Sequence, residues 1–295
     1  MEIIFLGTST AIPTKNRNHP AIFVKFNEEN ILIDCGEGTQ RQFKKAGINS
    51  GKITRILITH WHSDHTAGLP TLLESLYMSE VRRKIFIYGP KGTKEKIKYL
   101  ENIYGPFKLN LEIEEVSGEF LNLEEFKIKA SQMNHGIPTN AYSIILKDRL
   151  KLDKTKLNKY RLPNSPLLQK LKLGKDITYQ GKKIKSSEVS FKEKGKKISI
   201  ILDTEFNERT ISLAKDSDLL IAESSFLDNE REKAREYKHL TAKQAATIAK
   251  KSKSKKLALI HISQRYEKRI NEIEKEAKSI FKSVIIPKDF DRIEI

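Results

Sequence analysis

The sequence predicts an α/β fold in which two β-sheets pack face to face and helices cover their outer surfaces. Short apolar or β-branched runs of strand length recur along the chain, and segments with helical spacing follow them. These runs form two groups, separated by a basic segment at residues 147–197, and helices follow the strands in each group. Two such groups favour a layered α/β architecture.

The first group of elements lies before residue 147. Strands are predicted at residues 3–6, 21–26, 31–34, 55–59, 84–88, 126–133 and 142–146. A helix is predicted at residues 66–80 because Leu69, Leu72 and Leu76 have the spacing of one helical face. A second helix is predicted at residues 94–104.

The second group of elements lies after residue 197. Strands are predicted at residues 198–202, 219–222, 257–261 and 284–286, and helices at residues 208–215, 241–251 and 268–282. Thr241 is suited to cap its helix, since a threonine hydroxyl accepts a hydrogen bond from the amides of the first turn. The chain shows no repeat of fixed short period, so a repeat architecture is not expected.

The charge of the chain is concentrated in the basic segment. The 295 residues carry 55 Lys and Arg against 38 Asp and Glu, a formal net charge of +17. Residues 147–197 hold 17 of the basic and 5 of the acidic residues, which is +12 of that total. Such a concentration favours a polyanionic partner such as nucleic acid. The alternative is a lysine-rich surface that merely solvates the chain, which would spread its charge more evenly.

The same segment interrupts the rhythm of strands and helices. It contains Pro163 and Pro166 together with three glycines, and this composition is typical of an insertion or a projecting arm. The alternative is a solvated and partly disordered loop.

A single cysteine excludes a disulfide framework within one chain and favours a reducing, cytoplasmic location. Cys35 follows the apolar run 31–33, so we expect a buried small residue there, with a nucleophile as the alternative. No stretch of about 18 apolar residues is present, so no membrane span is expected. The N-terminus lacks the basic start and the cleavage site of a signal peptide.

Four candidate metal ligands lie within six residues, directly after the predicted strand 55–59. His60 and His62 have the spacing that places two imidazoles on one side of an extended backbone. Asp64 and His65 follow and can face a second metal ion. Imidazole and carboxylate ligands without thiolate suit zinc, with manganese or iron as alternatives. The competing interpretation is a surface turn that is rich in histidine by chance.

Further ligands are expected at the ends of other predicted strands. His135 follows strand 126–133, Asp203 follows strand 198–202, and His261 ends strand 257–261. Taken singly, a histidine at a strand end is usually structural, and an aspartate before threonine usually caps a turn or helix. The repeated pattern of a strand followed by a ligand favours one shared metal site.

The chain resembles the metallo-β-lactamase superfamily and, within it, the short form of the tRNA 3′-processing endonuclease, ribonuclease Z. The matching segments are residues 5–8, 34–40, 60–65 and 261–266. More specific are residues 13–18, which look like the family's Pro-x-Lys-x-Arg-Asn loop, and His239-Leu240-Thr241, which looks like its His-x-Thr motif. The basic segment lies where the family carries an exosite that binds tRNA.

The resemblance implies a single metallo-β-lactamase domain over residues 1–295, a four-layer αββα sandwich with an inserted basic arm at 147–197. It also implies two Zn²⁺ ions per chain, the first held by His60, His62 and His135. The second would be held by Asp64, His65 and His261. Asp203 would bridge the two ions.

The resemblance also assigns catalytic and binding roles. Asp64 would contact the attacking water as proton acceptor, and Glu223 and His239 would support proton transfer to the leaving group. For His239 the alternative is an exposed histidine at a helix start. Three residues of the loop 13–18 would contact the substrate, namely Lys15, Arg17 and Asn18.

The function implied by the resemblance is a zinc-dependent endoribonuclease that removes the 3′ trailer of precursor tRNA. It would leave a 3′-hydroxyl on the tRNA and a 5′-phosphate on the trailer, and it would work as a cytoplasmic homodimer without a dinucleotide cofactor. One alternative is a phosphodiesterase of the same fold that acts on a small molecule or another RNA. Another is a non-enzymatic RNA-binding protein.

Four positions depart from the family's pattern. Ser9 stands where the family has the last glycine of an early Gly-Thr-Gly. Leu202 stands where a glycine usually precedes the bridging aspartate, and Glu205 stands where an arginine usually follows it. In the arm, Ser165 replaces the glycine of a Gly-Pro pair. We therefore expect the turn around the bridging aspartate and the fine geometry of the arm to differ from the family.

Overall fold

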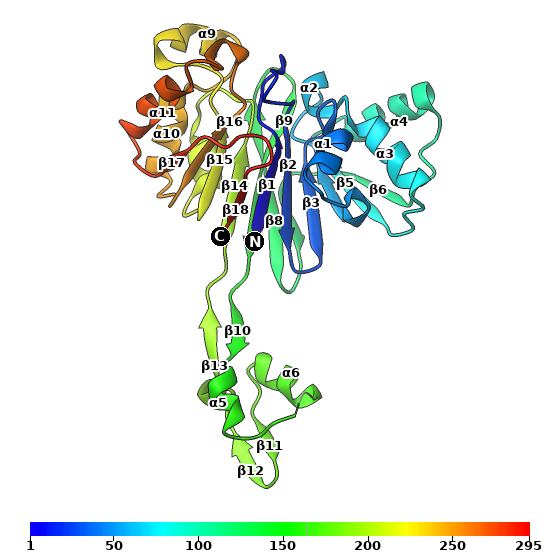
Figure 1. The fold of residues 1–295 in the computed structure, drawn as a ribbon, viewed down its shortest axis with the longest axis vertical. Helices are drawn as coiled ribbons and strands as arrows, with labels where there is room; N and C mark the ends of the chain where they lie inside the picture. The colour runs from blue at the N-terminus through cyan, green and yellow to red at the C-terminus, as the bar shows by residue number, and fades with distance from the viewer. Residues whose placement is uncertain (164) are drawn as a thin grey trace. The chain divides into compact units, whose positions relative to one another are not determined.

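The computed structural model describes residues 1–163 and 165–295 (Figure 1). Its contacts divide the chain into two compact units. The first unit contains residues 1–121, 128–144 and 197–295, and the second contains residues 122–127 and 145–196.

The first sheet of the large unit has seven strands in the order β18-β1-β2-β3-β4-β5-β6. Their bounds are β1 (Glu2–Gly7), β2 (Ala21–Phe26), β3 (Glu29–Ile33), β4 (Arg55–Leu57), β5 (Ile85–Gly89), β6 (Leu111–Glu115) and β18 (Arg292–Glu294). Strands β3 to β6 run parallel, and their crossover connections contain α1 (Thr39–Lys45), α2 (Ser63–Thr66), α3 (Leu69–Met78) and α4 (Thr93–Tyr104). Parallel strands inside a sheet are buried on both faces, which explains the nearly continuous apolar runs of β3, β4 and β5.

The second sheet also has seven strands, in the order β17-β16-β15-β14-β9-β8-β7. Their bounds are β7 (Gly118–Asn122), β8 (Phe126–Asn134), β9 (Pro138–Leu146), β14 (Lys197–Ile201), β15 (Leu219–Glu223), β16 (Leu257–Ile260) and β17 (Val284–Ile285). Its helices are α8 (Glu208–Ala214), α9 (Arg231–Glu236), α10 (Ala242–Lys251) and α11 (Ile270–Lys278). Strands β14 to β17 run parallel.

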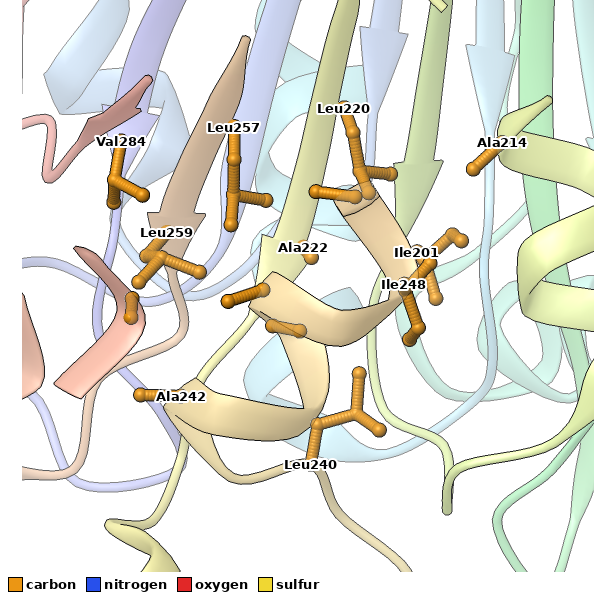
Figure 2. Close-up of a cluster of buried hydrophobic side chains, with 14 of the residues drawn as sticks. Ile201, Ala214, Leu220, Ala222, Leu240, Ala242, Ile248, Leu257, Leu259 and Val284 are labelled. Carbon is orange, nitrogen blue, oxygen red and sulfur yellow. The ribbon is translucent and has the colours of Figure 1, made fainter. Parts of the chain in front are cut away.

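One apolar core lies between the second sheet and its helices. Figure 2 shows Ala242 and Ile248 of α10 beside Leu220 and Leu259 of the sheet, and all four are fully buried. Alanines at several α10 positions let the helix approach the strands closely. Burial of each large aliphatic side chain contributes about 1.5–3 kcal/mol. Thr241 caps α10 as predicted, with a reciprocal hydrogen bond from its amide to Gln244.

The two sheets of the large unit pack against each other. The hydroxyl of Tyr142 in β9 donates to the Ile58 carbonyl, which follows β4, at 2.7 Å, and the Asn140 amide donates to the Thr59 carbonyl at 2.8 Å. Figure 1 places α10 and α11 outside one sheet and α1, α3 and α4 outside the other. The predicted four-layer αββα sandwich is therefore confirmed.

The small unit has a core of its own. Strand β10 (Arg149–Leu152) pairs antiparallel with β13 (Ser190–Glu193), and β11 (Ile177–Tyr179) forms a hairpin with β12 (Lys182–Ile184). Its helices are α5 (Lys154–Asn158), α6 (Pro166–Lys172) and α7 (Ser186–Val189). Its buried apolar side chains are Leu157, Leu171, Ile177, Ile184 and Val189. The described part of the basic segment is therefore folded around apolar side chains.

Several predicted elements differ from those observed. The helix predicted at 66–80 is α3, which begins only at Leu69, because α2 ends at Thr66 and the chain turns at Ala67 and Gly68. A β-carbon at Gly68 would lie 2.1 Å from the Gly36 carbonyl oxygen, so this close approach requires glycine. The predicted helix 268–282 shortens to Ile270–Lys278. The half-polar edge strands β6, β7 and β18 were not predicted, because their sequences lack a buried apolar run.

No helix among the described residues is long and apolar enough to cross a membrane.

Candidate metal centre

Six of the seven histidines converge at the ends of strands in the large unit. His60 and His62 follow β4, and their nearest ring nitrogens, Nε2 and Nδ1, are 3.0 Å apart. His135 directly follows β8, and its Nε2 lies 3.2 Å from His62 Nδ1. In a second group, His65 Nε2 lies 3.3 Å from Nε2 of His261, which directly follows β16. The sixth histidine is His239, before α10.

Asp203 lies between the two groups of histidines. Its Oδ2 lies 3.6 Å from His60 Nε2, 3.4 Å from His135 Nε2 and 3.5 Å from His65 Nε2. Its Oδ1 lies 3.1 Å from His261 Nε2. Asp64 completes the second group, with Oδ2 at 3.4 Å from His65 Nε2 and 3.7 Å from His261 Nε2. The structure thus brings together all seven residues predicted as metal ligands.

The hydrogen bonds behind two of these rings fit a site for cations. His65 Nδ1 donates to the Asp34 carboxylate at 2.7 Å, and His135 Nδ1 donates to the Lys238 carbonyl at 3.0 Å. A ring that donates from Nδ1 leaves Nε2 as the atom that can bind a metal ion. Asp203 Oδ1 accepts no hydrogen bond among the described residues, although His261 Nε2 is close. Imidazole nitrogens and carboxylate oxygens that converge on one point are the groups that bind metal ions.

Two sets of ligand atoms are compact enough for two ions. The ligand atoms of His60, His62, His135 and Asp203 lie within 4.8 Å of one another, and so do those of Asp64, His65 and His261. A third such set contains Asp203, Glu223, His239 and His261. The ligand atoms are nitrogen and oxygen without sulfur, and both zinc and other first-row metal ions accept such ligands.

Asp34 fixes the orientation of His65 directly and of His60 through Thr59, on the side of the rings that faces away from the candidate metal site. It is fully buried after β3. One carboxylate oxygen accepts from the Thr59 amide, and the other accepts from the Thr59 hydroxyl and from His65 Nδ1, all at 2.7 Å. The Thr59 hydroxyl also contacts His60 Nδ1 at 3.1 Å. The sequence analysis assigned Asp34 no role, although an acidic residue directly after a buried strand was a signal for one.

Replacing Asp34 by asparagine should weaken metal binding by about 10- to 100-fold, because partners behind a ligating histidine contribute that much. The amide keeps the volume but can present an N–H toward His65 Nδ1–H. Titration of metal-free protein with Zn²⁺ measures the affinity, and the unfolding temperature of the metal-free variant controls for misfolding. If the folded variant binds Zn²⁺ with wild-type affinity, Asp34 does not contribute to metal binding.

Glu223 connects three parts of the centre through hydrogen bonds. Its Oε1 accepts from the Thr204 amide at 2.8 Å, next to Asp203, and its Oε2 accepts from the Ser225 hydroxyl at 2.7 Å and pairs with His239 Nδ1 at 2.9 Å. The Ser225 oxygen in turn lies 2.9 Å from His261 Nδ1. Because Ser225 donates its hydroxyl proton to Glu223, its oxygen accepts a hydrogen bond from His261 Nδ1. This series of hydrogen bonds therefore leaves His261 Nε2 as the ring nitrogen that faces the centre. Ser225 was missed by the sequence analysis.

His239 is held beside the ligand groups and largely shielded from solvent. Its side chain is 17% exposed, and its ring centroid lies 4.9 Å from that of His135 and 5.6 Å from that of His261. Burial of the ring opposes protonation, but the negative charges of Glu223 and Asp203 outweigh it and raise the pKa of His239 to about 9. A pKa above neutrality favours the protonated ring, which can donate a proton.

Replacing His239 by glutamine should lower kcat for hydrolysis at this centre by about 10²- to 10⁴-fold, the usual contribution of a general acid. The metal content should stay at the wild-type value, because the seven proposed metal ligands do not include His239. Steady-state kinetics and metal analysis on the same preparation check both parts. A fall in metal content would instead show that His239 binds a metal ion together with Asp203 and His261.

The backbone is strained where three of these residues leave their strands. Asp34, Asp203 and His261 have φ angles of +56°, +35° and +56°. Non-glycine residues in the left-handed region cost about 1–3 kcal/mol each and cluster at functional sites. This conformation breaks the strand's alternation of side chains, so that carboxylate and imidazole turn toward the same point.

The turn around Asp203 is held by contacts that replace the family's usual residues. Leu202, in place of glycine, is fully buried in the core. Glu205, in place of arginine, accepts from the Asn134 side-chain amide at 2.6 Å, and its backbone amide donates to the Asn134 carbonyl at 3.0 Å. The departures seen in the sequence thus leave Asp203 beside both histidine groups.

The loop 13–18 presents one of its predicted substrate contacts to solvent. Lys15 is exposed. Arg17 is only 5% exposed, and its Nη1 donates to the Thr8 hydroxyl at 2.6 Å and to the Pro287 carbonyl at 2.7 Å. The Asn18 side chain donates to the Glu37 carbonyl at 2.7 Å. Arg17 and Asn18 therefore hold the loop in place in this structure. Cys35 is fully buried, as expected.

The α/β sandwich and its histidine and aspartate centre define a metallo-β-lactamase-fold protein with a metal-binding site. Comparisons with known proteins agree. The human tRNase Z, short form (ELAC1), matches the structure with a TM-score of 0.73 and 27% identity, over 100% of this chain and 99% of that one. The metallo-β-lactamase fold protein YhfI from Bacillus subtilis matches with a TM-score of 0.73 at 17% identity, which shows the fold alone.

Sequence relatives identify the family. The chain is 39% identical over 296 residues to ribonuclease Z of Nanoarchaeum equitans, covering 99% of this chain and 92% of the relative. It is 38% identical over 300 residues to ribonuclease Z of Archaeoglobus fulgidus, covering 100% and 97%. Residues 1–159 also match the model of the family described as anti-Pycsar protein Apyc1. The chain belongs to the ribonuclease Z family.

Proposed function

We propose that this chain is a metal-dependent endoribonuclease that removes the 3′ trailer of precursor tRNA by phosphodiester hydrolysis. The observation that carries the proposal is the position of Asp203, whose two oxygens lie within 3.6 Å of histidines from both ligand groups. This arrangement suits two neighbouring ions, and ribonuclease Z relatives match the chain along its whole length.

The proposed metal is zinc, with two ions per chain. His60, His62 and His135 would hold the first and Asp64, His65 and His261 the second, with Asp203 shared. When bound, two such ions make a water molecule nucleophilic near neutral pH and neutralise the charge that builds on the phosphoryl oxygens.

Two side chains would move the protons of the reaction. Asp64 is 8% exposed and lies at the edge of its ligand group, where its free oxygen can accept a proton from the attacking water. His239, whose raised pKa favours the protonated ring, would donate its proton to the departing ribose oxygen. Glu223 would then stabilise the ring and hold its orientation. The expected products are a tRNA with a 3′-hydroxyl and a trailer with a 5′-phosphate.

The small unit is the proposed site for the body of the tRNA. Some of its cations are paired with acidic groups, namely Arg149, Lys151, Lys183 and Lys192. Helices α5 and α6 add further exposed lysines, namely Lys154, Lys156, Lys170 and Lys172. Structured RNA is bound largely through its shape and backbone phosphates, and lysines supply charge for such contacts. Lys15 would add a phosphate contact from the large unit.

We further propose that the protein is a cytoplasmic homodimer. Helices α3 and α4 expose apolar side chains, with Met78 and Ile103 each 71% exposed and Tyr104 63% exposed. Exposed apolar groups of this size favour burial against another protein surface. A reducing cytoplasm suits a chain with one free cysteine.

The proposed function is tested by incubating the zinc-loaded protein with a 3′-extended precursor tRNA and mapping both new ends. A cut at the junction of tRNA and trailer, with a 3′-hydroxyl and a 5′-phosphate, is the expected result. If the protein hydrolyses small phosphodiesters but leaves the precursor tRNA uncleaved, the small-molecule alternative is supported instead.

A further inference from the structure

A cavity of about 590 Å³ lies beside the loop 13–18. Its lining joins that loop to two segments distant in sequence, one after the metal-centre strand β16 and one before β18. The lining includes Lys15, Arg17, Glu267, Ile270, Lys288 and Phe290. None of these residues belongs to the metal centre, and we refer to this feature as the C-terminal cavity.

The lining of the C-terminal cavity carries three positive and two negative side chains, so its net charge is positive. Glu267 accepts from the Asn16 side chain at 2.9 Å, and Asp289 accepts from the Asn18 amide at 2.7 Å and from the Thr8 hydroxyl at 2.8 Å. The positive charge of Arg17 in the wall interacts with both carboxylates and offsets part of their charge. Lys15 and Lys288 are exposed. In the described part of the chain, neither ammonium group takes part in a recorded ion pair, so both can meet an anion.

Phe290 adds a half-buried aromatic ring in an unusual backbone conformation. Its φ is +74°, and among the non-glycine residues with positive φ in the described chain it is the one with an apolar side chain. Hydrogen bonds on both sides enforce this conformation: the Phe290 amide donates to the Phe5 carbonyl at 2.6 Å, and the Phe5 amide donates to the Asp291 carbonyl at 3.1 Å.

The conformation of Phe290 would suit glycine better. A left-handed backbone conformation is unfavourable for any L-residue that has a β-carbon, whereas glycine adopts it without this cost. A bulky side chain at such a position is a true outlier, and strain of this kind is a feature of functional sites. Of the other non-glycine residues with positive φ in the described chain, Asp34, Asp203 and His261 lie at the metal centre, and the remaining seven are polar residues in turns. Phe290 differs from both groups because its side chain is apolar and lines a cavity.

The wall of the C-terminal cavity is tied to the chain that carries the metal ligands. Arg17, in the wall, donates to the hydroxyl of Thr8, and the Thr8 carbonyl accepts from the amide of Ile262 at 3.2 Å. Ile262 directly follows the proposed ligand His261 and pairs with Ser9. A ligand in the cavity would thus sit on the same rigid segment as the reaction centre.

We propose that the C-terminal cavity binds one nucleotide of the substrate RNA that flanks the cleaved bond. The base would stack on Phe290, and its phosphate would contact Lys15 and Lys288. An aromatic ring beside two cations is the combination by which proteins hold single-stranded nucleotides. The inference rests on the proposed function and adds to it a subsite made by Lys288 and Phe290.

Variants of Phe290 separate stacking from packing. Phe290→Leu should raise KM for precursor tRNA by at least about fivefold, as loss of one base–aromatic stack does. Phe290→Tyr should keep the wild-type KM. Phe290→Gly relieves the backbone, so its unfolding temperature should equal or exceed that of Phe290→Leu while its KM rises equally. A ring that only packs predicts instead that KM stays at the wild-type value in all three variants.

Substrates that lack one base identify the nucleotide. An abasic site at the correct position next to the cut should raise KM for the wild type but add nothing for Phe290→Leu. Scanning both sides of the cut tells whether the base belongs to the tRNA or to the trailer. If every abasic substrate affects the two proteins equally, the cavity does not hold a base and the inference is wrong.

A binding measurement keeps the inference testable even without cleavage. NMR titration with a 5′-phosphorylated dinucleotide should show saturable shifts at the cavity for the wild type and for Lys282→Glu, an exposed control lysine nearby in sequence. The shifts should be lost in Lys288→Glu and Phe290→Leu. Failure to bind, with cleavage intact, overturns the cavity alone; failure to cleave precursor tRNA overturns the proposed function.

Discussion

Replacing Asp64 by alanine is expected to lower the rate of precursor tRNA cleavage by at least about 10³-fold. Asp64 belongs to the second ligand group and is the proposed proton acceptor for the attacking water, so the change removes two contributions at once. Charge stabilisation by a metal ion is worth several kcal/mol, and each 1.36 kcal/mol in the barrier is a factor of ten in rate.

Binding of precursor tRNA should change little in the same variant, because Asp64 is almost buried and offers no positive charge. Single-turnover kinetics give the rate, and filter binding in the absence of cleavage gives Kd. Glu28→Ala, which removes an exposed carboxylate from the turn between β2 and β3, serves as the control and should match the wild type. Full activity of the Asp64 variant would remove the mechanism.

Deleting the small unit is expected to raise Kd for precursor tRNA by about 10²- to 10³-fold while leaving hydrolysis of a small phosphodiester within about twofold. Residues 147–197 carry +12 of the net charge, and the loss of several phosphate contacts produces an effect of this size at physiological salt. The small substrate makes no such contacts, and all proposed ligands lie outside this segment.

The ends of the segment allow a clean deletion. The Leu146 amide donates to the Lys196 carbonyl at 2.8 Å, so a short glycine-containing turn can join β9 to β14. Binding should also lose most of its dependence on salt concentration, since fewer counterions are released. Equal losses on precursor tRNA and on the small phosphodiester would contradict an exosite and point to damage of the sandwich.

The sandwich and the positions of the candidate ligands could be predicted because both follow from local patterns. Strand β16 is a fully buried apolar run, and His60, His135, Asp203 and His261 each follow or end a predicted strand. The repeated pattern of a strand followed by a candidate ligand indicated that these residues share one place. The prediction that His60 and His62 point to the same side needed only the geometry of an extended backbone.

What the sequence could not reveal depends on contacts between distant segments. The Asp34–His65 and Ser225–His261 hydrogen bonds join residues 31 and 36 positions apart, and each residue alone has an ordinary structural interpretation. Arg17 was expected to face phosphate, but the Pro287 carbonyl, 270 positions away, holds it inside. The strain at Phe290 is likewise visible only once β18 is paired with β1.

The core of the small unit was hidden by its own composition. Its lysines, prolines and glycines indicated an insertion, whereas the five buried apolar residues are spread over short elements without a long periodic run. Helix α10, in contrast, was predicted from the sequence, with Thr241 as its cap.

The proposed mechanism requires seven side chains to hold two metal ions in one centre, and metal analysis of the purified protein tests this most directly. Elemental analysis after loading with Zn²⁺ and gel filtration should give about two ions per chain for the wild type, and fewer for Asp203→Ala, whose carboxylate is shared by both ligand groups. A wild-type protein that retains no more than a trace of any transition metal, while fully folded, would contradict the account.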